Sequence, residues 1–372
     1  MSELKLCKLG DVVSFGNGKT RPSSEGNIPI YGGNGILGYC ADKNYEGETI
    51  IIGRVGAYCG ATHYENKPIW VSDNALSAKP KGKNNTKFFY YFLKDMALNQ
   101  HAGGSSHPLV TQTLLNSLDV EVIDNPEEQK AIAAVLSSLD DKIDLLHRQN
   151  KTLEAMAETL FRQWFIEEAQ DDWEEKILND VISVKGGTTP STKEPKYWGG
   201  DIYWTAPRDL SNHKAIFLFD TERKITAKGL AKIGSGLMPI GTVLLSSRAP
   251  IGYMAITDIP TAINQGYIAI VCDKSVSNFF MYLWCKINME DIKNAGNGST
   301  FQEISKSNFK ALSLTIPPKQ KLEKFDEVIS SPFKKIRSNK IQIQTLEKLR
   351  NTLLPKLMSG EVRVSMQENI KE

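Results

Sequence analysis

The sequence lacks the features that mark membrane, secreted and metal-binding proteins. Its 372 residues include only five cysteines and five histidines. No cysteines form a CxxC pair and no histidines follow an HExxH spacing, so we expect neither a disulfide framework nor a zinc site. The first residues lack the apolar core of a signal peptide, and no later run approaches the ~20 apolar residues of a membrane span. The sequence therefore predicts a cytoplasmic protein without a bound metal.

An excess of charge of either sign is also absent. With 45 basic and 43 acidic residues the formal net charge is +2, so bulk charge neither proposes nor excludes a nucleic-acid partner. Any basic surface must be local.

A convincing cofactor motif is missing as well. Gly33, Gly35 and Gly38 spell GxGxxG, but another strand-like run follows them where a dinucleotide-binding loop would open a helix. We interpret these glycines as a tight loop whose backbone can approach a ligand or DNA closely. The sequence predicts no cofactor bound by this chain.

Catalytic constellations are equally scarce. Ser105, Ser106 and His107 could pair a nucleophile with a base, but the corresponding turn at 298–300 has no histidine. The Pro-Pro-aromatic motif of DNA methyltransferases and the carboxylate-lysine constellation of nucleases are not evident. We expect no catalytic residue, and we interpret the turn as solvated or in contact with phosphate.

What the sequence does contain is a long apolar stripe, from Pro126 to about Phe165, at the three-four spacing of a coiled-coil helix. Its predicted seam positions are Leu139, Ile143, Leu146, Asn150, Leu153, Ala157, Leu160 and Trp164. About 40 helical residues make a rod of roughly 60 Å, long enough to hold two domains apart. The alternative is that the stripe is the core of a helical bundle.

A second stripe runs from Pro317 to Gly360. Its predicted seam positions are Ile336, Ile343, Leu346, Leu349, Leu353 and Leu357. Ile143, Leu153, Met156, Leu160 and Trp164 match Ile336, Leu346, Leu349, Leu353 and Leu357 at one constant offset. Pro332 and Pro355 depart from the pattern, so we expect a bend at the first and a weakened last turn at the second.

The rest of the chain is an internal repeat. Short strand-like runs and one helical segment near 88–100 precede the first rod, and the same order of signals returns from about Trp173 to Ile316. ETIIIGR is echoed by GTVLLSSR, and Asn74 is matched with Asn264. The chain thus consists of two copies of a mixed α/β globule followed by a long helix, which predicts an object suited to a two-part target.

Basic, aromatic and amide side chains recur in the loops of both copies. Arginine and asparagine can read base edges and lysine can hold phosphates, so we treat these residues as candidates for DNA binding. In the first copy they are Lys19, Arg21, Tyr31, Asn34, Tyr39, Arg54 and Tyr58. In the second they are Lys193, Tyr197, Trp198, Tyr203, Trp204, Arg208 and Arg248.

Several stretches carry a resemblance to a known family. They are KLGDVVSFGNGKT with its echo ILNDVISVKGGTTPS, the loop IPIYGGNGILGY, the helix entry NPEEQKAIAAVLSSLDDKID, and the end RNTLLPKLMSGEVRV. With them the chain resembles, over nearly its whole length, the specificity subunit of Type I restriction-modification enzymes.

The resemblance implies an α/β (α+β) fold with two similar, mainly β target-recognition domains separated by two long antiparallel coiled-coil helices. The expected boundaries are 1–125 and 171–316 for the domains, 126–170 and 317–360 for the helices, and 361–372 for a tail. Each domain would read one half of a split double-stranded DNA site. Because IPIYGGNG in the first copy differs from KYWGGDIYWTAPRDL in the second, we expect unlike half-sites.

The resemblance also implies partners. The helices would bind two methyltransferase subunits, which recruit restriction and translocase subunits. S-adenosylmethionine, ATP and magnesium would belong to those partners, and this chain would not be catalytic. An alternative keeps the architecture without DNA, as a coiled-coil scaffold displaying two ligand-binding globules. A nuclease acting alone is a third possibility.

Overall fold

The computed structural model describes residues 4–103, 108–211, 215–248, 250–298 and 302–364. The chain divides into two compact units, Met1–Asp144 with Gln344–Glu372, and Leu145–Ile343. Each unit therefore contains one globule and a part of each long helix. None of the helices among the described residues combines the length and the hydropathy needed to cross a membrane.

The first unit contains three small sheets, ordered β2-β8-β5-β6, β4-β3-β7 and β1-β9. The strands are β1 (Leu4–Lys8), β2 (Val13–Asn17), β3 (Ile28–Gly32), β4 (Gly35–Cys40), β5 (Thr49–Gly53), β6 (Thr62–Glu65), β7 (Trp70–Val71), β8 (Ala75–Pro80) and β9 (Asp119–Ile123). β5 is central in its sheet and every residue of it is buried, as expected of a continuous β-branched run.

Short helices close the first core. They are α1 (Leu9–Val12), η1 (Gly56–Tyr58), α2 (Thr86–Asp95), η2 (Leu98–His101) and α3 (Gln112–Ser117). The Asn85 side chain caps α2 by accepting a hydrogen bond from the Phe88 N–H at 2.9 Å, and the apolar face of α2 then enters the core. The helix predicted near 88–100 is thus confirmed as α2 and η2.

The second unit repeats this plan, with sheets ordered β11-β18-β15-β16-β13, β14-β12-β17 and β10-β19. The strands are β10 (Glu174–Ile177), β11 (Ser183–Gly186), β12 (Trp198–Thr205), β13 (Phe217–Leu218), β14 (Arg223–Ile225), β15 (Val243–Ser247), β16 (Ile251–Thr257), β17 (Ala262–Ile263), β18 (Tyr267–Val271) and β19 (Ser313–Ile316). The helices are α5 (Leu178–Val181), η4 (Pro195–Tyr197), α6 (Pro207–Ser211), α7 (Ala227–Leu230), α8 (Asn278–Ile287), α9 (Met289–Asn294) and α10 (Lys306–Lys310).

The structure confirms the repeat, including the match of ETIIIGR with GTVLLSSR, but corrects the match of Asn74. The strand registers of the two main sheets make Arg54 the counterpart of Ser247, one residue before Arg248. The Arg54 N–H donates to the Asn74 carbonyl at 3.0 Å, and the Ser247 N–H donates to the Gly266 carbonyl at 2.8 Å. Asn74 therefore corresponds to Gly266 and not to Asn264. Equal letters misled the comparison, because Asn264 lies two residues before the position that the strand registers match with Asn74.

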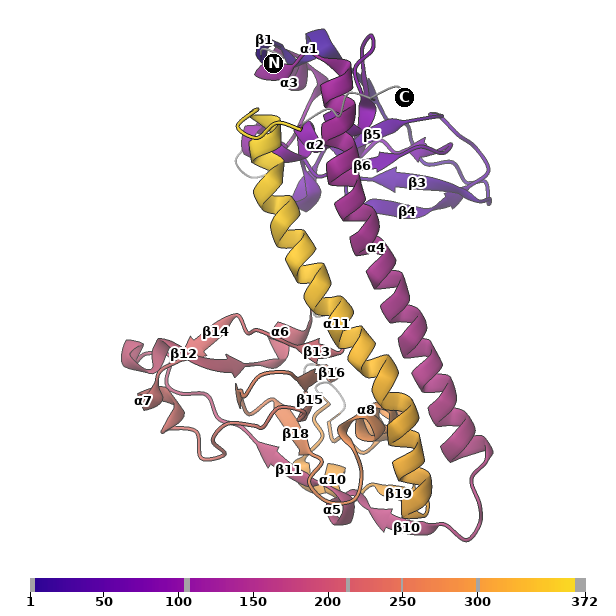
Figure 1. Cartoon of the computed structure of the whole chain (residues 1–372), viewed down its shortest axis with the longest axis vertical. Coiled ribbons are helices and arrows are strands. Elements are labelled where there is room, and N and C mark those ends of the chain that lie inside the picture. Colours follow the sequence, from indigo (N-terminus) through magenta and orange to yellow (C-terminus); the bar gives the residue numbers. More distant parts are fainter. Residues whose placement is uncertain (1–3, 104–107, 212–214, 249, 299–301, 365–372) are drawn as a thin grey trace, which may run out of the picture. The chain divides into compact units, whose positions relative to one another are not determined.

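The two predicted rods are α4 (Pro126–Arg162), which leads into the π-helical turn η3 (Gln163–Glu167), and α11 (Lys319–Met358), of 37, 5 and 40 residues. α11 is assigned as one unbroken helix through Pro332 and Pro355 (Figure 1). Within the second unit the helices are antiparallel, since the Phe161 and Phe325 rings lie 5.9 Å apart and Asn150 Oδ1 accepts from Asn339 Nδ2 at 2.8 Å.

The predicted seam is largely buried. Ile143, Leu146, Ala157, Ile336, Ile343 and Leu357 are buried, and Leu139, Asn150, Leu153, Leu160, Trp164, Leu346 and Leu353 are partly buried. Leu349 is 44% exposed, so its assignment to the seam is wrong, and Met156, its match at the constant offset, is 51% exposed. Near the end of α11 the buried residues are Leu354, Leu357 and Met358, because the core of the first unit meets that helix face.

Candidate nucleic-acid interface

Several loops meet at one end of the first globule, where β2, β5 and β7 end. The Lys19 N–H, just after β2, donates to the Val71 carbonyl at 3.0 Å, and the Arg54 N–H, just after β5, donates to the Asn74 carbonyl at 3.0 Å. At Gly18 an added Cβ would lie 1.8 Å from the Ser72 carbonyl oxygen, so only glycine allows this approach. The loops after β2 and β5 are thereby fixed on both sides of the turn from β7 to β8.

The two-residue turn between β3 and β4 joins the same surface. His63 Nε2 lies 3.0 Å from the Gly33 carbonyl oxygen, and a Cβ on Gly33 would lie 3.1 Å from the Gly53 Cα. Gly35 has φ +87°, a conformation that glycine tolerates and other residues rarely adopt. The exposed Asn34 side chain is therefore held beside the end of β5, where Arg54 follows.

The seven candidates of the first copy differ in accessibility. Lys19, Arg21, Asn34, Tyr39 and Tyr58 are exposed, and Arg54 is half-buried. Arg54 Nε is buried and has no hydrogen-bond partner among the described residues, which leaves guanidinium capacity for a ligand.

Tyr31 is the exception in this set. It is 7% exposed, and its hydroxyl donates to Glu65 at 3.1 Å. Burial and the Glu65 carboxylate raise the pKa of the phenol above its usual range. Tyr31 therefore supports the core and is not placed to contact DNA, which corrects its selection as a candidate.

The second globule builds the same surface from equivalent bonds. The Thr188 N–H donates to the Ile263 carbonyl at 3.0 Å, as the Lys19 N–H does to Val71. An added Cβ on Gly187 would lie 1.9 Å from the Ile263 carbonyl oxygen. In each globule the loop after the first strand of the main sheet, β2 or β11, thus lies against the turn that follows the short parallel strand, β7 or β17.

An indole secures that loop in both copies. Trp70 Nε1 donates to the Lys19 carbonyl at 3.3 Å, and Trp204 Nε1 donates to the Thr188 carbonyl at 3.3 Å. The two tryptophans come from different strands, β7 and β12, so the repeat in the sequence did not reveal their common role. Because Trp204 is only 4% exposed, it is a support for the loop, and its selection as a DNA contact is also corrected.

The small sheet of the second unit carries alternating cations and rings. The Arg223 guanidinium lies 3.4 Å from the Trp198 ring centroid, Lys224 Nζ lies 4.7 Å from that of Tyr203, and Trp198 meets Trp204 edge-on at 5.0 Å. Arg223 and Lys224 were not among the candidates. In the sequence they simply follow Asp220 and Glu222, and nothing local indicates that β14 pairs with the aromatic strand β12.

The remaining candidates of the second copy lie around this sheet. Lys193 and Arg208 are exposed, and Tyr197, Trp198, Tyr203 and Arg248 are partly exposed. Because Tyr31 pairs with Val71 as Thr205 pairs with Ile263, Asn34 and Arg208, each three residues further on, are counterparts. Each globule therefore presents a base-reading type of side chain at the same place. Arg248 Nη1 lies 3.8 Å from Glu303, and this ion pair must loosen if Arg248 is to bind a phosphate.

The described residues contain no group of three or more His, Cys, Asp or Glu side chains that could hold a metal. The turns of Ser105, Ser106 and His107 and of Ser299 and Thr300 lie outside the described residues. The described surface presents hydrogen-bond donors, amides and aromatic rings. These groups are suited to binding nucleic acid.

The described part of the chain thus contains two copies of one scaffold, with different polar side chains on corresponding loop tips. The family model of the Type I restriction modification DNA specificity domain matches residues 1–155 and 170–352. The chain belongs to that family.

Relatives agree with this assignment. The MjaIX specificity subunit of Methanocaldococcus jannaschii is 40% identical over 194 residues, which span 52% of this chain and 45% of that relative. The HindI specificity subunit of Haemophilus influenzae is 24% identical over 330 residues, 68% of this chain and 71% of that relative. The crystal structure of a Type I S subunit from M. genitalium has the same fold, with a TM-score of 0.69, 18% identity and coverage of 98% of this chain and 97% of that one.

Proposed function

We propose that this chain is the DNA specificity subunit of a Type I restriction-modification complex, in which each globule reads one half of an asymmetric, bipartite site. The observation that carries the proposal is the duplicated loop surface, with a common backbone and unlike side chains. A shared scaffold gives both globules one way of approaching a duplex, and different tips give each its own sequence preference.

The side chains at these tips suit direct readout. Arg54, half-buried beside the exposed Asn34, can present a fork to guanine while the amide of Asn34 pairs with adenine. In the second globule Arg208 takes the place of Asn34, and Thr189 with Gln265 forms a polar pair at 2.7 Å on the neighbouring loop. Each bidentate contact is worth about 1–3 kcal/mol of discrimination against a wrong base.

The partners of this function are double-stranded DNA, two methyltransferase subunits bound to the long helices, and restriction subunits recruited through them. The chain itself is non-catalytic in this proposal, and S-adenosylmethionine, ATP and Mg²⁺ are bound by the partners. We place the complex in the cytoplasm, where DNA is accessible and where the five cysteines, all free in the structure, stay reduced.

The test is a binding and methylation assay with the methyltransferase subunit supplied. The complex should bind and methylate one bipartite sequence, and the affinity should fall steeply between 50 and 200 mM salt because phosphate contacts release counterions. Base substitutions in one half-site should weaken binding, and only changes in one of the two globules should restore it. Binding that ignores sequence and salt would contradict the proposal.

A further inference from the structure

The two main sheets differ at one edge. In the second unit the short strand β13 adds to the outer edge of β16 in parallel, with the Ile256 N–H donating to the Ile216 carbonyl at 2.7 Å and the Asp258 N–H donating to the Leu218 carbonyl at 2.9 Å. Figure 1 shows β13 beside β16. β13 belongs to the segment that joins β12 to β14, and it completes a five-stranded sheet.

Among the described residues of the first unit, no strand pairs with the outer edge of β6. There β3 and β4 are joined directly by Gly33 and Asn34, and the main sheet ends at β6. The shared registers of β5 and β15 make Tyr64 the counterpart of Ile256. Because Gly53 N–H bonds to the Ala61 carbonyl at 2.7 Å, the alternation of an antiparallel ladder turns the Tyr64 N–H away from β5. The Tyr64 N–H therefore points outward from the edge of β6, at the position where the Ile256 N–H of β16 donates to the β13 segment.

A cavity lies next to this edge, within the first unit. It has a volume of about 320 Å³ and is lined by Tyr64, by α2, by the face of α4 from Ser137 to Asp144 and by Arg350 of α11. Arg350 binds Asp140 at 2.6 Å, so Asp141 and Asp144 are the carboxylates of this face that a further cation could meet. Ser137 is 9% exposed and lies beside Tyr91, whose hydroxyl donates to Asp140 at 2.8 Å.

In the second unit the corresponding place is filled. Three residues before the matched positions Ile143 and Ile336 lie Asp140 and Phe333. Phe333 stacks on Phe279 at 4.4 Å, and Phe217 of β13 meets it edge-on at 6.4 Å. Strand β13 thus also places the Phe217 ring against Phe333 of α11.

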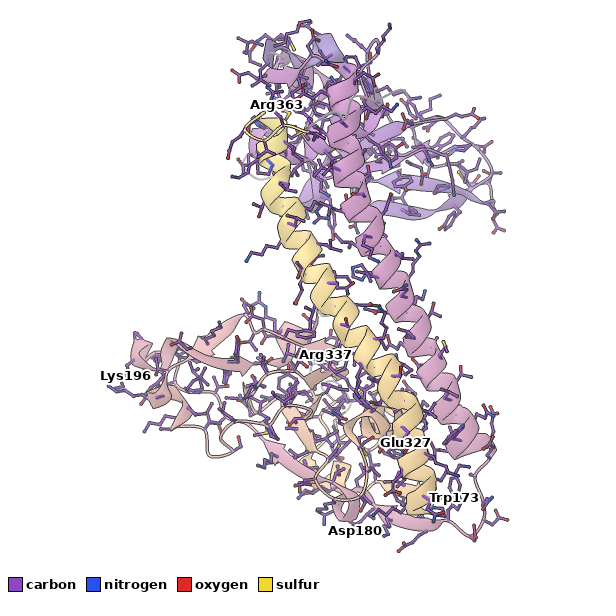
Figure 2. The ribbon with its side chains drawn as sticks, viewed as in Figure 1. Trp173, Asp180, Lys196, Glu327, Arg337 and Arg363 are labelled. Carbon is purple, nitrogen blue, oxygen red and sulfur yellow. The ribbon has the colours of Figure 1, made fainter. Side chains whose placement is uncertain are left out.

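Charge at this place is reversed between the two units. Asp144 is the counterpart of Arg337, which Figure 2 labels on α11. Arg337 binds the Asp258 carboxylate with two hydrogen bonds of 2.6 and 2.9 Å. Asp141 and Asp144 are exposed, and among the described residues neither has an ion-pair partner. The lysines on the other side of the cavity, Lys87 and Lys94, each lie 5.4 Å from a tyrosine ring centroid. A basic group is therefore what the α4 side would attract.

We infer that the edge of β6 is a docking site for an extended segment of a partner protein. The segment runs parallel to β6, as β13 runs along β16, accepts a hydrogen bond from the Tyr64 N–H, inserts an aromatic side chain into the cavity and presents a basic residue to Asp141 and Asp144. This mode of binding by strand addition is independent of how the loop tips read DNA.

The probe is a labelled peptide that copies the strand the second unit uses, residues 214–219 (KAIFLF), followed by arginine. Fluorescence anisotropy with the full-length chain should give saturable binding. Tyr64→Pro removes the edge donor and should weaken binding at least tenfold, whereas Tyr64→Phe keeps the N–H and should bind as the parent does. Melting curves of both variants check that the fold is retained.

Charge supplies a second, non-destructive variant. Asp144→Arg should weaken the arginine peptide several-fold and favour a peptide ending in glutamate, which a merely unfolded protein could not do. The inference is overturned if the peptide shows no saturable binding up to millimolar concentration, if Tyr64→Pro and Tyr64→Phe bind equally, or if Asp144→Arg leaves the preference between the two peptides unchanged.

Discussion

Lengthening both long helices by one heptad should lengthen the unread gap between the two half-sites. Both α4 and α11 are continuous across the boundary between the two units, which lies after Asp144 and after Ile343. The insertion points follow from the structure: Asn150 and Asn339 face each other through a 2.8 Å hydrogen bond, so seven residues are added after Asn150 and after Ser338. A heptad keeps the apolar stripe on the same face of each helix.

The size of the effect follows from helix and duplex geometry. Seven residues at ~1.5 Å each add about 10 Å to each helix. Since successive base pairs lie about 3.4 Å apart, the gap should grow by about three base pairs. The added pairs rotate one half-site by roughly 100° around the duplex, given about 10.5 pairs per turn, so binding should weaken even where the new spacing is accepted.

Mapping of methylated bases across the genome of a strain with the double insertion is the assay. Both half-site sequences should be retained while the gap lengthens. The matched control, an insertion in α4 alone, removes the facing register and should abolish methylation. Retained activity with an unchanged gap would refute the reasoning, because the helices would then not set the distance, and new half-site sequences would show that they help to read bases.

Three further outcomes are expected. Replacing the partly buried Leu153 and Leu346 together by Asp should lower the melting temperature and release methyltransferase subunits in size-exclusion chromatography, since unpaired buried charge costs several kcal/mol. Lys286→Met should destabilise the chain by about 2 kcal/mol in urea unfolding, because Lys286 bridges Glu154 and a second carboxylate of α4. Burial lowers the pKa of Lys286, but its hydrogen bonds to those carboxylates raise it above the usual value, so the difference between the two proteins should be full below about pH 10.4 and vanish as pH rises through the folded-state pKa. Arg54→Lys, which loses the planar fork, should weaken recognition of one half-site about tenfold or more in competition binding and leave the other unchanged.

The architecture could be predicted because it rests on long-range patterns in the sequence. Apolar residues at three-four spacing fixed α4 and α11 within a few residues, and the order of strand and helix signals gave the repeat. Leu349 was misassigned because periodicity shows which residues share a face, whereas the globule decides which part of that face is covered. Helix α11 continues through Pro332, and its neighbours Ile329 and Phe333 are buried in the core of the second unit.

The candidate surface was predictable in outline only. Glycines and basic residues marked the loops, and Lys19, Asn34 and Arg54 do lie on one joined surface. Tyr31 and Trp204 were misjudged because the sequence does not distinguish an exposed aromatic residue that contacts a ligand from a buried one that supports a loop. Arg223 was missed because its stacking on Trp198 depends on the pairing of β12 with β14, which local sequence does not specify.

The central claim is that one globule reads one half-site. Exchanging residues 1–125 for the matching domain of a relative with a different target tests it most directly, with methylation mapped genome-wide afterwards. The residues of α4 and α11 that complete the first core, among them Leu136 and Leu354, stay in place, so the donor domain must supply a compatible apolar face. One half-site should change to that of the donor, while the other half-site and the gap should be retained. A change in both half-sites, or in neither, from a folded and active complex would contradict it.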